Sequence, residues 1–179
     1  MIITISGFHG TGKSTLAEAI AKEFSLRYVS AGKFFREMAK KRQMSVKEYT
    51  DYVDQHPEID QMIDDRTINE AKKGDVVLEG LLVAWMTRDF STINFLLFTD
   101  EQTRMNRIAF RDETTYEDAK NETLKREKRA IDRFKRLYNI NLNDYSIYDI
   151  ILNTALWSEE SMIRAGITLI KEYLKSIKK

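Results

Sequence analysis

The sequence predicts one α/β domain built on a parallel sheet of five strands. Its apolar runs are short, rich in Ile, Val, Phe and Tyr, and lack the alternation of a half-exposed sheet, as parallel strands covered on both faces do. Helical patterns separate these runs, which favours an α/β fold, and the length of 179 residues fits a single domain. The five expected strands are Ile2–Ser6, Arg27–Ser30, Val76–Glu79, Ile93–Phe98 and Tyr148–Asn153. The pattern does not fix their order in the sheet.

The first half of the chain places one simple helix and one longer helical insert between its strands. Lys13–Phe24 carries apolar residues at i, i+3 and i+4 spacing, which predicts an amphipathic helix. Between the second and third strands, residues 33–75 have room for two or three helices. Ser45 and Glu48 form a capping box, and Pro57 precedes an acidic first turn, so a helix is expected to begin at each.

The second half repeats this arrangement. Capping boxes at residues 99–102 and 114–117 predict two helices within residues 101–147, and a last helix is expected over about Ser158–Ser176. Both helical inserts are longer than a crossover between parallel strands requires. We expect them to project over the carboxyl edge of the sheet, where open α/β folds bind their ligands.

The residues Gly7–Ser14 read G-F-H-G-T-G-K-S and match the phosphate-binding loop pattern G-x-x-x-x-G-K-[ST]. The motif follows an apolar strand and opens an amphipathic helix, which is its required setting. Its backbone amides and the helix N-terminus can surround phosphate oxygens, Lys13 can bridge the β- and γ-phosphates, and the Ser14 hydroxyl can bind Mg²⁺. The predicted nucleotide-binding residues are Gly7, Gly10, Thr11, Gly12, Lys13, Ser14 and Thr15. We interpret His9 as a spacer in the loop rather than a catalytic base, because phosphoryl transfer to a phosphate acceptor needs no histidine base.

Composition excludes several classes of function. The chain has no cysteine and two histidines, which excludes thiolate chemistry and makes a multi-histidine metal site improbable. A net charge of +1 argues against binding of nucleic acid or an anionic membrane through the overall charge of the protein. No apolar run approaches the ~18 residues of a membrane span. No signal-peptide pattern is visible, so we expect a cytoplasmic protein and, in solution, a monomer.

Charge is unevenly distributed along the chain. Residues 45–75 hold nine acidic and four basic side chains, whereas residues 104–136 hold eleven basic and seven acidic ones. The basic segment includes two sets of arginines at helical spacing: Arg104, Arg107 and Arg111, then Arg126, Arg129, Arg133 and Arg136. Arginine suits phosphate oxygens, so these faces are candidates for meeting a polyphosphate. The structural alternative is a solvated helix with i, i+4 pairs such as Glu122–Arg126 and Asp132–Arg136.

A small kinase explains these features better than other nucleotide-binding classes. The guanine-reading Asn-Lys-x-Asp motif and the switch motif Asp-x-x-Gly of GTPases are absent. The run Phe95–Asp100 resembles the metal-binding strand of larger ATPases, but we interpret Asp100 as an acid at a helix start. Phosphoryl transfer depends on positioning, charge neutralisation and exclusion of water, which an arginine-bearing helix can supply.

Several further segments, taken together, resemble the nucleoside monophosphate kinases, and most closely the archaeal-type cytidylate kinases. The resemblance spans nearly the whole chain. Its more specific parts are Ser30-Ala31-Gly32 followed by Phe35-Arg36, and Asp144-Tyr145-Ser146-Ile147-Tyr148-Asp149. Its other parts are the phosphate-binding loop, Val76–Glu79, Ala84-Trp85-Met86, Arg107 with Arg111, Thr123–Arg126, Tyr138–Asn141 and Asn153-Thr154.

The resemblance implies a three-layer P-loop NTPase fold, a monophosphate-binding insert at about 33–75 and a lid at about 112–147, all in one domain of residues 1–179. It implies transfer of the γ-phosphoryl group from ATP to a nucleoside monophosphate, with CMP or dCMP as the leading acceptor, and with Mg²⁺. Lys13, Arg126 and Arg133 would act in catalysis, and Arg107 and Arg111 would lie near the donor. Ser30, Gly32 and Arg36 would bind the acceptor, and Ser14 and Glu79 would serve the metal.

Two departures from the family pattern leave the acceptor open. Lys33 stands where an acidic residue is usual, and Gly80-Leu81-Leu82 lacks the arginine usual after the glutamate of the third strand. Lys33 is a candidate to replace that charge. AMP, UMP or a non-nucleotide acceptor, and a nucleotide-gated RNA- or protein-binding module, remain as alternatives. Candidates for stacking on an acceptor base, each of which also suits a core position, are Tyr28, Phe34, Phe35, Tyr49 and Tyr52; Trp85 is expected to pack internally.

Overall fold

The strands of the computed structural model, which describes residues 1–177, form one parallel sheet in the order β2-β3-β1-β4-β5. These strands are β1 (Ile2–Ser6), β2 (Arg27–Ser30), β3 (Val76–Glu79), β4 (Ile93–Phe98) and β5 (Ile150–Asn153). Because β3 and β4 flank β1 on opposite sides, the chain reverses its direction of travel across the sheet beside β1. A reversal of this kind opens a crevice at the carboxyl ends of the strands.

The predicted strands are confirmed except at the start of the last one. Tyr148 lies outside β5, in a turn where its backbone N–H donates to the Tyr145 carbonyl at 3.1 Å. Asp149 follows, and its carboxylate accepts a hydrogen bond from the Asn94 backbone N–H at 2.7 Å. The ladder with β4 therefore begins only at Ile150.

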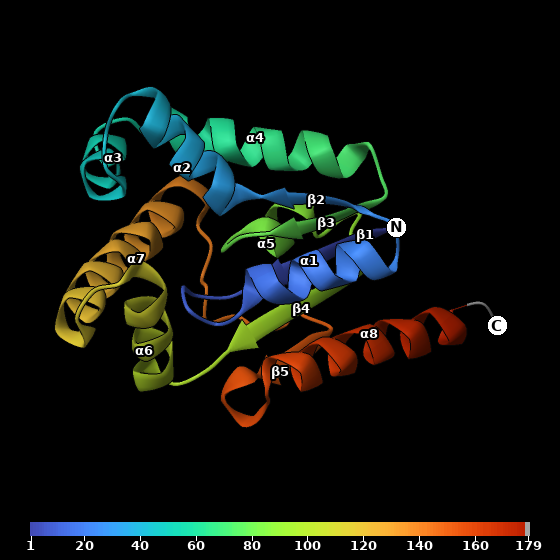
Figure 1. Cartoon of the computed structure of the whole chain (residues 1–179). Helices are drawn as coiled ribbons and strands as arrows, with labels where there is room; N and C mark the ends of the chain where they lie inside the picture. Colours follow the sequence, from blue (N-terminus) through green and yellow to red (C-terminus); the bar gives the residue numbers. More distant parts are fainter. Residues whose placement is uncertain (178–179) are drawn as a thin grey trace.

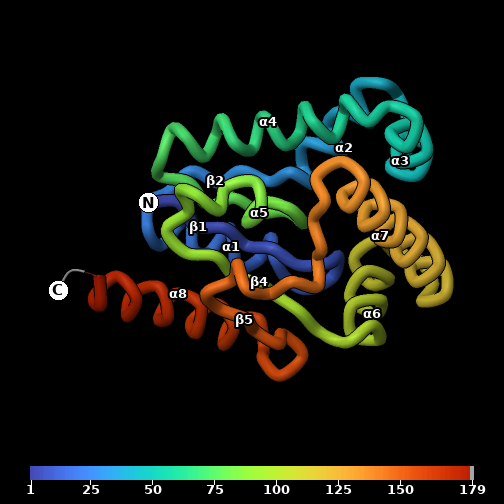
Figure 2. The backbone as a smooth tube through the Cα atoms, turned by 180° about the vertical axis from the view of Figure 1, so that it is seen from behind, coloured from blue at the N-terminus to red at the C-terminus, as the bar shows by residue number. Residues whose placement is uncertain are grey.

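Helices cover both faces of the sheet. On one face, α1 (Lys13–Glu23) and α8 (Glu159–Ser176) pack over a core that includes Ile3, Ile5 and Phe95 (Figure 1). On the other face, α4 (Glu58–Lys72) and α5 (Val83–Thr87) cover Val76 and Leu78, with α5 in front of the sheet in Figure 2. The strand side chains alternate between these two apolar layers, which explains why the strands read as continuous apolar runs.

The two helical inserts extend beyond the carboxyl edge of the sheet, as predicted. The first contains α2 (Ala31–Lys41), α3 (Val46–Val53) and α4, and the second contains α6 (Glu101–Asp112) and α7 (Tyr116–Tyr138). Figures 1 and 2 both show α7 lying beside α3, away from the sheet. The inserts thus meet each other above the crevice.

The helix starts were predicted with mixed success. The capping box of Ser45 and Glu48 is confirmed, with both reciprocal hydrogen bonds present. The two threonine boxes are wrong by one residue: α6 is capped by Asp100, which accepts from the Thr103 N–H at 2.8 Å, and α7 by Thr115. The carboxylate of Asp100 can accept hydrogen bonds both from that N–H and from the Thr103 hydroxyl, so the helix begins after it. This also confirms Asp100 as a helix-start acid.

Along residues 1–177, no helix combines the length and the apolar character that crossing a bilayer requires.

Candidate active site

A cavity of about 690 Å³ lies at the carboxyl edge of the sheet, between the phosphate-binding loop and the two helical inserts. Most residues predicted to bind ligand line it: Gly7, Gly10, Gly12, Lys13, Ser14, Thr15, Gly32, Arg36, Glu79, Arg107, Arg111, Arg126 and Arg133. Thr11 and Ser30 are not among the lining residues. The Thr11 hydroxyl donates to the Phe8 carbonyl at 2.8 Å, and the Ser30 hydroxyl caps α2, so both side chains hold local structure.

The phosphate-binding loop has a backbone that only glycine can follow at its tightest points. Gly7, Gly10 and Gly12 have φ values of 146°, 78° and 87°. A Cβ atom at Gly7 would lie 2.3 Å from the Leu97 carbonyl oxygen, and one at Gly10 would lie 2.7 Å from that of Arg104. The loop therefore needs glycine for its conformation and for close approach of neighbouring backbone. The helix that follows has no side-chain cap at its N-terminus, which leaves its N–H groups available to an anion.

Lys13 lies across this loop. Its ammonium group donates a hydrogen bond to the Phe8 carbonyl at 2.7 Å, and burial lowers its pKa to about 8. Glu79 is the main group that opposes this shift, through its negative charge. A bound polyphosphate would add further negative charge and stabilise the protonated lysine.

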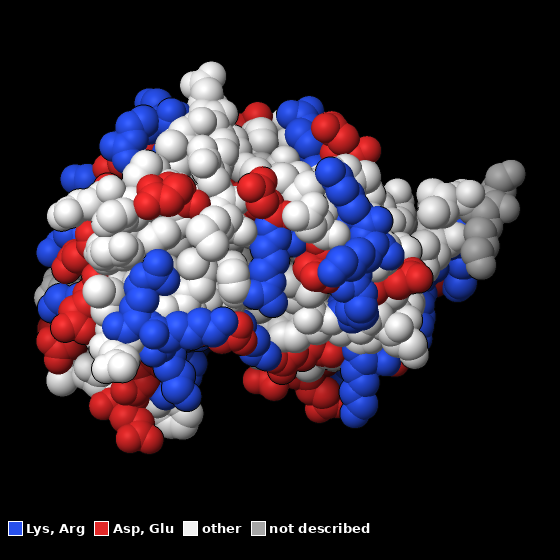
Figure 3. All heavy atoms as spheres, turned by 90° about the horizontal axis from the view of Figure 1, so that it is seen from above, with Lys and Arg blue, Asp and Glu red and all other residues white. Residues whose placement is uncertain are grey.

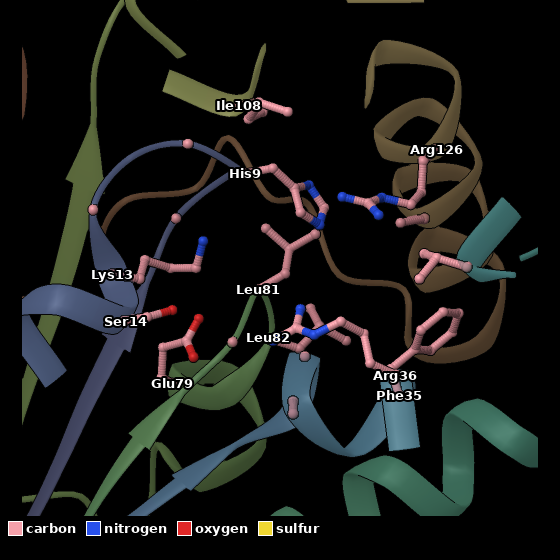
Figure 4. A pocket seen from close by; sticks show the side chains of 18 of the residues that line it. His9, Lys13, Ser14, Phe35, Arg36, Glu79, Leu81, Leu82, Ile108 and Arg126 are labelled. Atoms are coloured by element: carbon pink, nitrogen blue, oxygen red, sulfur yellow. The ribbon is translucent and has the colours of Figure 1, made fainter. Parts of the chain in front are cut away.

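Ser14 and Glu79 present oxygen atoms that can bind a metal ion in one wall of the cavity, near Lys13 (Figure 4). Glu79 is 6% exposed, and Tyr28 orients it by donating a hydrogen bond to Oε2 at 3.1 Å. No group of three or more His, Asp or Glu side chains within residues 1–177 is placed to hold a metal ion. A hydroxyl and a single carboxylate fit Mg²⁺, which keeps several waters and takes its other ligands from phosphate.

The arginines of α6 have three different surroundings. Arg104 is 8% exposed and points inward, where it donates to Glu127 at 2.6 Å and to the His9 carbonyl at 3.1 Å. Arg107 donates to the Thr154 hydroxyl and carbonyl, both at 2.9 Å, while lining the cavity. Arg111 also lines the cavity and forms a two-pronged pair with Asp112. The structural alternative thus holds for Arg104, and the cavity contains the other two.

Glu127 connects α7 to the phosphate-binding loop. Its Oε1 accepts from the His9 backbone N–H at 3.0 Å and lies 3.0 Å from His9 Nδ1, in addition to the Arg104 contact. Burial alone would raise the pKa of Glu127, but the hydrogen bonds from His9 and Arg104 outweigh it and the pKa is lowered. Burial lowers the pKa of His9 to about 4, so its ring is neutral at pH 7 and is poorly suited to take up a proton there.

Three arginines converge on the cavity side of α7. Arg126 reaches in from α7 and Arg36 from α2 (Figure 4). The buried Nε of Arg126 has no hydrogen-bond partner among the described residues. Arg36, Arg111 and Arg126 all line the cavity. Burial lowers the pKa of Arg126, and the charges of Arg111 and Arg36 lower it further, against the opposing charge of Glu127. A cluster of like charges with an unsatisfied buried donor is completed by an anion such as phosphate.

Arg133 lines the same cavity but is already engaged by carboxylates. It is 7% exposed, and it donates to Asp60 at 2.7 Å and to Asp54 at 2.6 Å. Arg129 pairs with Asp51 and Asp54. These ion pairs attach α7 to α3 and α4, and they explain the opposite charges of the two inserts. The structural alternative named pairs within the helix, whereas Glu122, Arg129 and Arg133 pair with residues of the other insert.

Apolar and aromatic side chains also line the cavity, among them Ile63, Leu82 and Phe134. Phe35 lines it, whereas Tyr49 is fully buried in the cluster that joins α2, α3 and α4. The other stacking candidates, Tyr28, Phe34 and Tyr52, do not line the cavity. Lys33 pairs with Glu18 at 2.8 Å and its ammonium lies 4.5 Å from the centre of the Tyr28 ring. It is therefore not positioned to replace an arginine near Leu81, which does line the cavity.

Sequence reasoning missed three acidic residues of the site: Asp60, Asp64 and Glu127. Asp60 and Asp64 line the cavity from α4, and both are spaced i, i+4 on a helix whose start was predicted. That spacing was a usable signal, because it places two carboxylates on one helix face. Glu127 had no comparable signal, since its partners lie 118 and 23 residues away.

Comparison with known proteins agrees with the geometry. Residues 2–156 match the model of the cytidylate kinase-like family. The cytidylate kinase of Pyrococcus horikoshii is 41% identical over 162 residues, which cover 90% of this chain and 84% of that protein. The cytidylate kinase of Methanocaldococcus jannaschii is 42% identical over 167 residues, covering 90% and 93%.

Solved structures show the same fold at low sequence identity. An uncharacterised protein from Eubacterium ventriosum has a TM-score of 0.68 with 17% identity and coverage of 97% and 98%. Shikimate kinase from Bacteroides thetaiotaomicron has a TM-score of 0.66 with 15% identity and coverage of 98% of both chains. The family match spans most of the sequence and includes every predicted site residue, so the chain belongs to the cytidylate kinase-like family.

Proposed function

We propose that the protein transfers the γ-phosphoryl group of ATP to a nucleoside monophosphate, with CMP or dCMP as the acceptor. The observation that carries this proposal is one cavity with a phosphate-binding loop at one end and the arginines Arg36, Arg111 and Arg126 beside it. Membership in the cytidylate kinase-like family, and relatives named as cytidylate kinases, support the choice of CMP.

At the donor end, the loop amides and the N-terminus of α1 receive the phosphates of ATP. Lys13 exchanges its contact with the Phe8 carbonyl for phosphate oxygens, and this favours its protonated form. Arg107 and Arg111 lie on the donor side, where Arg107 also braces α6 against Thr154 and the loop. Ser14 and Glu79 are the residues that would hold Mg²⁺, which neutralises phosphate charge when bound.

At the acceptor end, Arg36 and the backbone at Gly32 receive the phosphate of the monophosphate. Arg126 lies between the two ends and stabilises the charge that spreads over the transferred group. Arg133 contributes less charge of its own, because it is paired with Asp54 and Asp60, and chiefly holds α7 over the acceptor. The acceptor phosphate oxygen attacks the γ-phosphorus in line, the bond to the β-phosphate oxygen breaks, and ADP leaves.

The two helical inserts would then act as the monophosphate-binding insert and the lid. The lid contacts two other parts of the chain. Glu127 accepts a hydrogen bond from the phosphate-binding loop, and Arg129 and Arg133 form ion pairs with the monophosphate-binding insert. Closure of this kind excludes water, which would otherwise compete as acceptor. The substrates are small molecules, and every proposed contact comes from one chain, so a monomer suffices.

An assay of ADP release with Mg-ATP tests the proposal against a panel of CMP, dCMP, UMP, AMP, GMP and shikimate. The expected result is the highest kcat/KM with CMP or dCMP, and turnover lost in the Lys13→Ala variant. Preferential turnover of another acceptor would contradict the choice of base. ATP binding without turnover of any acceptor would contradict the kinase assignment.

A further inference from the structure

Asp64 stands at the acceptor end of the cavity without a cationic partner. It lines the cavity from α4, and the same cavity is lined by the apolar residues Ile63, Leu82 and Phe134. Its Oδ2 accepts a hydrogen bond from the Tyr138 hydroxyl at 2.6 Å. Its Oδ1 has no hydrogen-bond partner among residues 1–177, in contrast to the carboxylate of Asp60 one turn away, which Arg133 binds.

The surroundings of Asp64 favour its neutral form. The groups that face it are Asp60 and Asp65 on its own helix and Tyr138 from α7. Burial, with some repulsion from the two neighbouring carboxylates, raises the pKa of Asp64 to about 7, although the Tyr138 hydrogen bond opposes this. A neutral carboxylic acid held in this way has two hydrogen-bonding functions: an O–H on Oδ1 and an acceptor on Oδ2.

Such a pair of functions matches the edge of a cytosine base. Cytosine presents an acceptor at N3 beside an amino donor at N4. The O–H of Asp64 can donate to N3 while Oδ2 accepts from N4. Uracil presents the reverse order, a donor at N3 beside an oxygen at position 4. Because Tyr138 donates to Oδ2, the proton of the neutral acid is placed on Oδ1, which opposes the N–H of uracil.

The neighbouring lining residues Leu81, Leu82, Asp60 and Thr50 are less suited than Asp64 to hydrogen-bond to an acceptor base. Leu81 and Leu82, which occupy the segment after β3, have no side-chain hydrogen-bonding group. Asp60 is committed to Arg133. Thr50, the remaining polar residue from α3, donates its hydroxyl to the Val46 carbonyl at 2.8 Å.

We propose that Asp64, held by Tyr138, is the residue that reads the acceptor base, by pairing its carboxyl group with the N3 and N4 positions of cytosine and disfavouring uracil. The inference rests on the proposed function and deepens it, because it assigns the choice between pyrimidines to a single side chain. The phosphate of the acceptor is held elsewhere, by Arg36 and Arg126, so base recognition and phosphate recognition can be separated by mutation.

Two substitutions at Asp64 test the proposal, with kcat/KM measured for CMP and UMP between pH 6 and 8.5. Asp64→Leu removes both hydrogen-bonding functions, so CMP turnover should fall about 10- to 100-fold while UMP changes little. Asp64→Asn keeps them, because the amide oxygen can accept from Tyr138 and from N4 while its N–H donates to N3. This variant should retain CMP turnover. The matched controls are Asp65→Leu and Asp65→Asn, compared with the wild type at pH 6, where Asp64 stays mainly neutral; Asp65 is exposed on the same helix and does not line the cavity.

The pH profile adds a readout that a merely structural role would not move. The wild-type protein should lose about 25-fold in kcat/KM for CMP, relative to Asp64→Asn, as the pH rises from 6.5 to 8.5 and Asp64 ionises with its pKa of about 7. Taking the ratio of the two enzymes cancels the titration of the CMP phosphate, which both experience. ATP affinity and the thermal midpoint should stay unchanged and so show that each variant is folded.

The outcomes separate the two proposals. A collapse of the CMP-to-UMP ratio in Asp64→Leu, with retention in Asp64→Asn and the Asp65 controls, supports the assignment. A ratio within twofold of wild type in a folded Asp64→Leu variant overturns it, while CMP turnover by the wild type leaves the kinase proposal intact. A wild-type protein that does not phosphorylate CMP overturns the proposed acceptor, and the base assignment with it.

Discussion

The two ends of the cavity are built in different ways. The donor end is a stretch of consecutive residues, Gly7–Ser14, whose backbone makes the binding surface and whose glycines meet neighbouring backbone closely. The acceptor end is assembled from side chains on α2, α4 and α7 and from the segment after β3. The donor end is specified locally, whereas the acceptor end exists only because ion pairs and apolar contacts bring separate helices together.

The difference predicts how each end responds to mutation. Changes at the donor end should affect every acceptor equally, since all share ATP. Changes at the acceptor end should distinguish between acceptors or between binding and turnover.

Replacing Lys13 by alanine should break the donor end. We expect turnover of every acceptor to fall by about 10³-fold or more, because the Lys13 ammonium lies across the phosphate-binding loop and charge neutralisation dominates phosphoryl transfer. Steady-state kinetics with CMP and dCMP measure the effect. Lys33→Ala is the control, since that lysine pairs with Glu18 away from the cavity and should change kcat less than about twofold. Comparable activity in both variants would remove Lys13 from catalysis.

Arg126→Ala should slow phosphoryl transfer, because Arg126 lies between the donor end and the acceptor end of the cavity. Its charge is closest to the transferred group in the proposed geometry, so kcat should fall by about 10²-fold while KM for the acceptor changes less. Arg136→Ala, an exposed arginine near the end of the same helix, serves as control. An increase in acceptor KM with unchanged kcat would place Arg126 in ground-state binding instead.

Arg36→Ala should weaken the acceptor end alone. Loss of one charge-assisted contact with the acceptor phosphate should raise acceptor KM by about tenfold and leave KM for ATP unchanged. Initial rates measured over a grid of both substrates separate the two constants. Equal increases in both KM values would show that the two ends are not independent.

The smallest effect expected is a loss of folding stability at acid pH. It arises at His9, where the phosphate-binding loop contacts Glu127 of α7. The pKa of His9 is lowered to about 4 by burial, below its ordinary value of 6.5, so the unfolded chain binds a proton first as the pH falls. The stability that the neutral ring provides is therefore present above pH 6.5 and lost progressively between pH 6.5 and 4. We expect a loss on the order of 1 kcal/mol, since the ring is partly exposed.

Urea unfolding at pH 7 and pH 5 measures this loss, and His9→Asn should reduce it. Unchanged pH dependence in that variant would assign the loss to other groups. The ionisation of Glu127 acts in the same direction, because its lowered pKa also favours the folded state above the ordinary carboxyl range.

The fold and the conformation of the phosphate-binding loop were predicted well from the sequence, because both depend on local patterns. Apolar runs indicated the strands, and a spaced motif indicated the loop, with errors of one or two residues at helix and strand boundaries. The strand order required the structure, because parallel pairing joins residues 74 positions apart along β1 and β3.

The acceptor end was less predictable, for the same physical reason. Arg126 and Arg133 have the same side chain and lie on one helix, yet one faces other arginines and the other binds two carboxylates. Only the position of α3 and α4 relative to α7 decides this. Lys33 likewise has the right charge in the right segment, but its side chain turns toward Glu18.

The most direct test of the account follows the fate of the phosphoryl group. The protein would be incubated with Mg-ATP labelled in the γ-phosphate and an excess of CMP, and the labelled products separated. The account predicts that the label moves to CDP, with one CDP formed for each ADP and little inorganic phosphate, because the two inserts close over the site and exclude water. Label recovered mainly as inorganic phosphate, at a rate that CMP does not change, would contradict it.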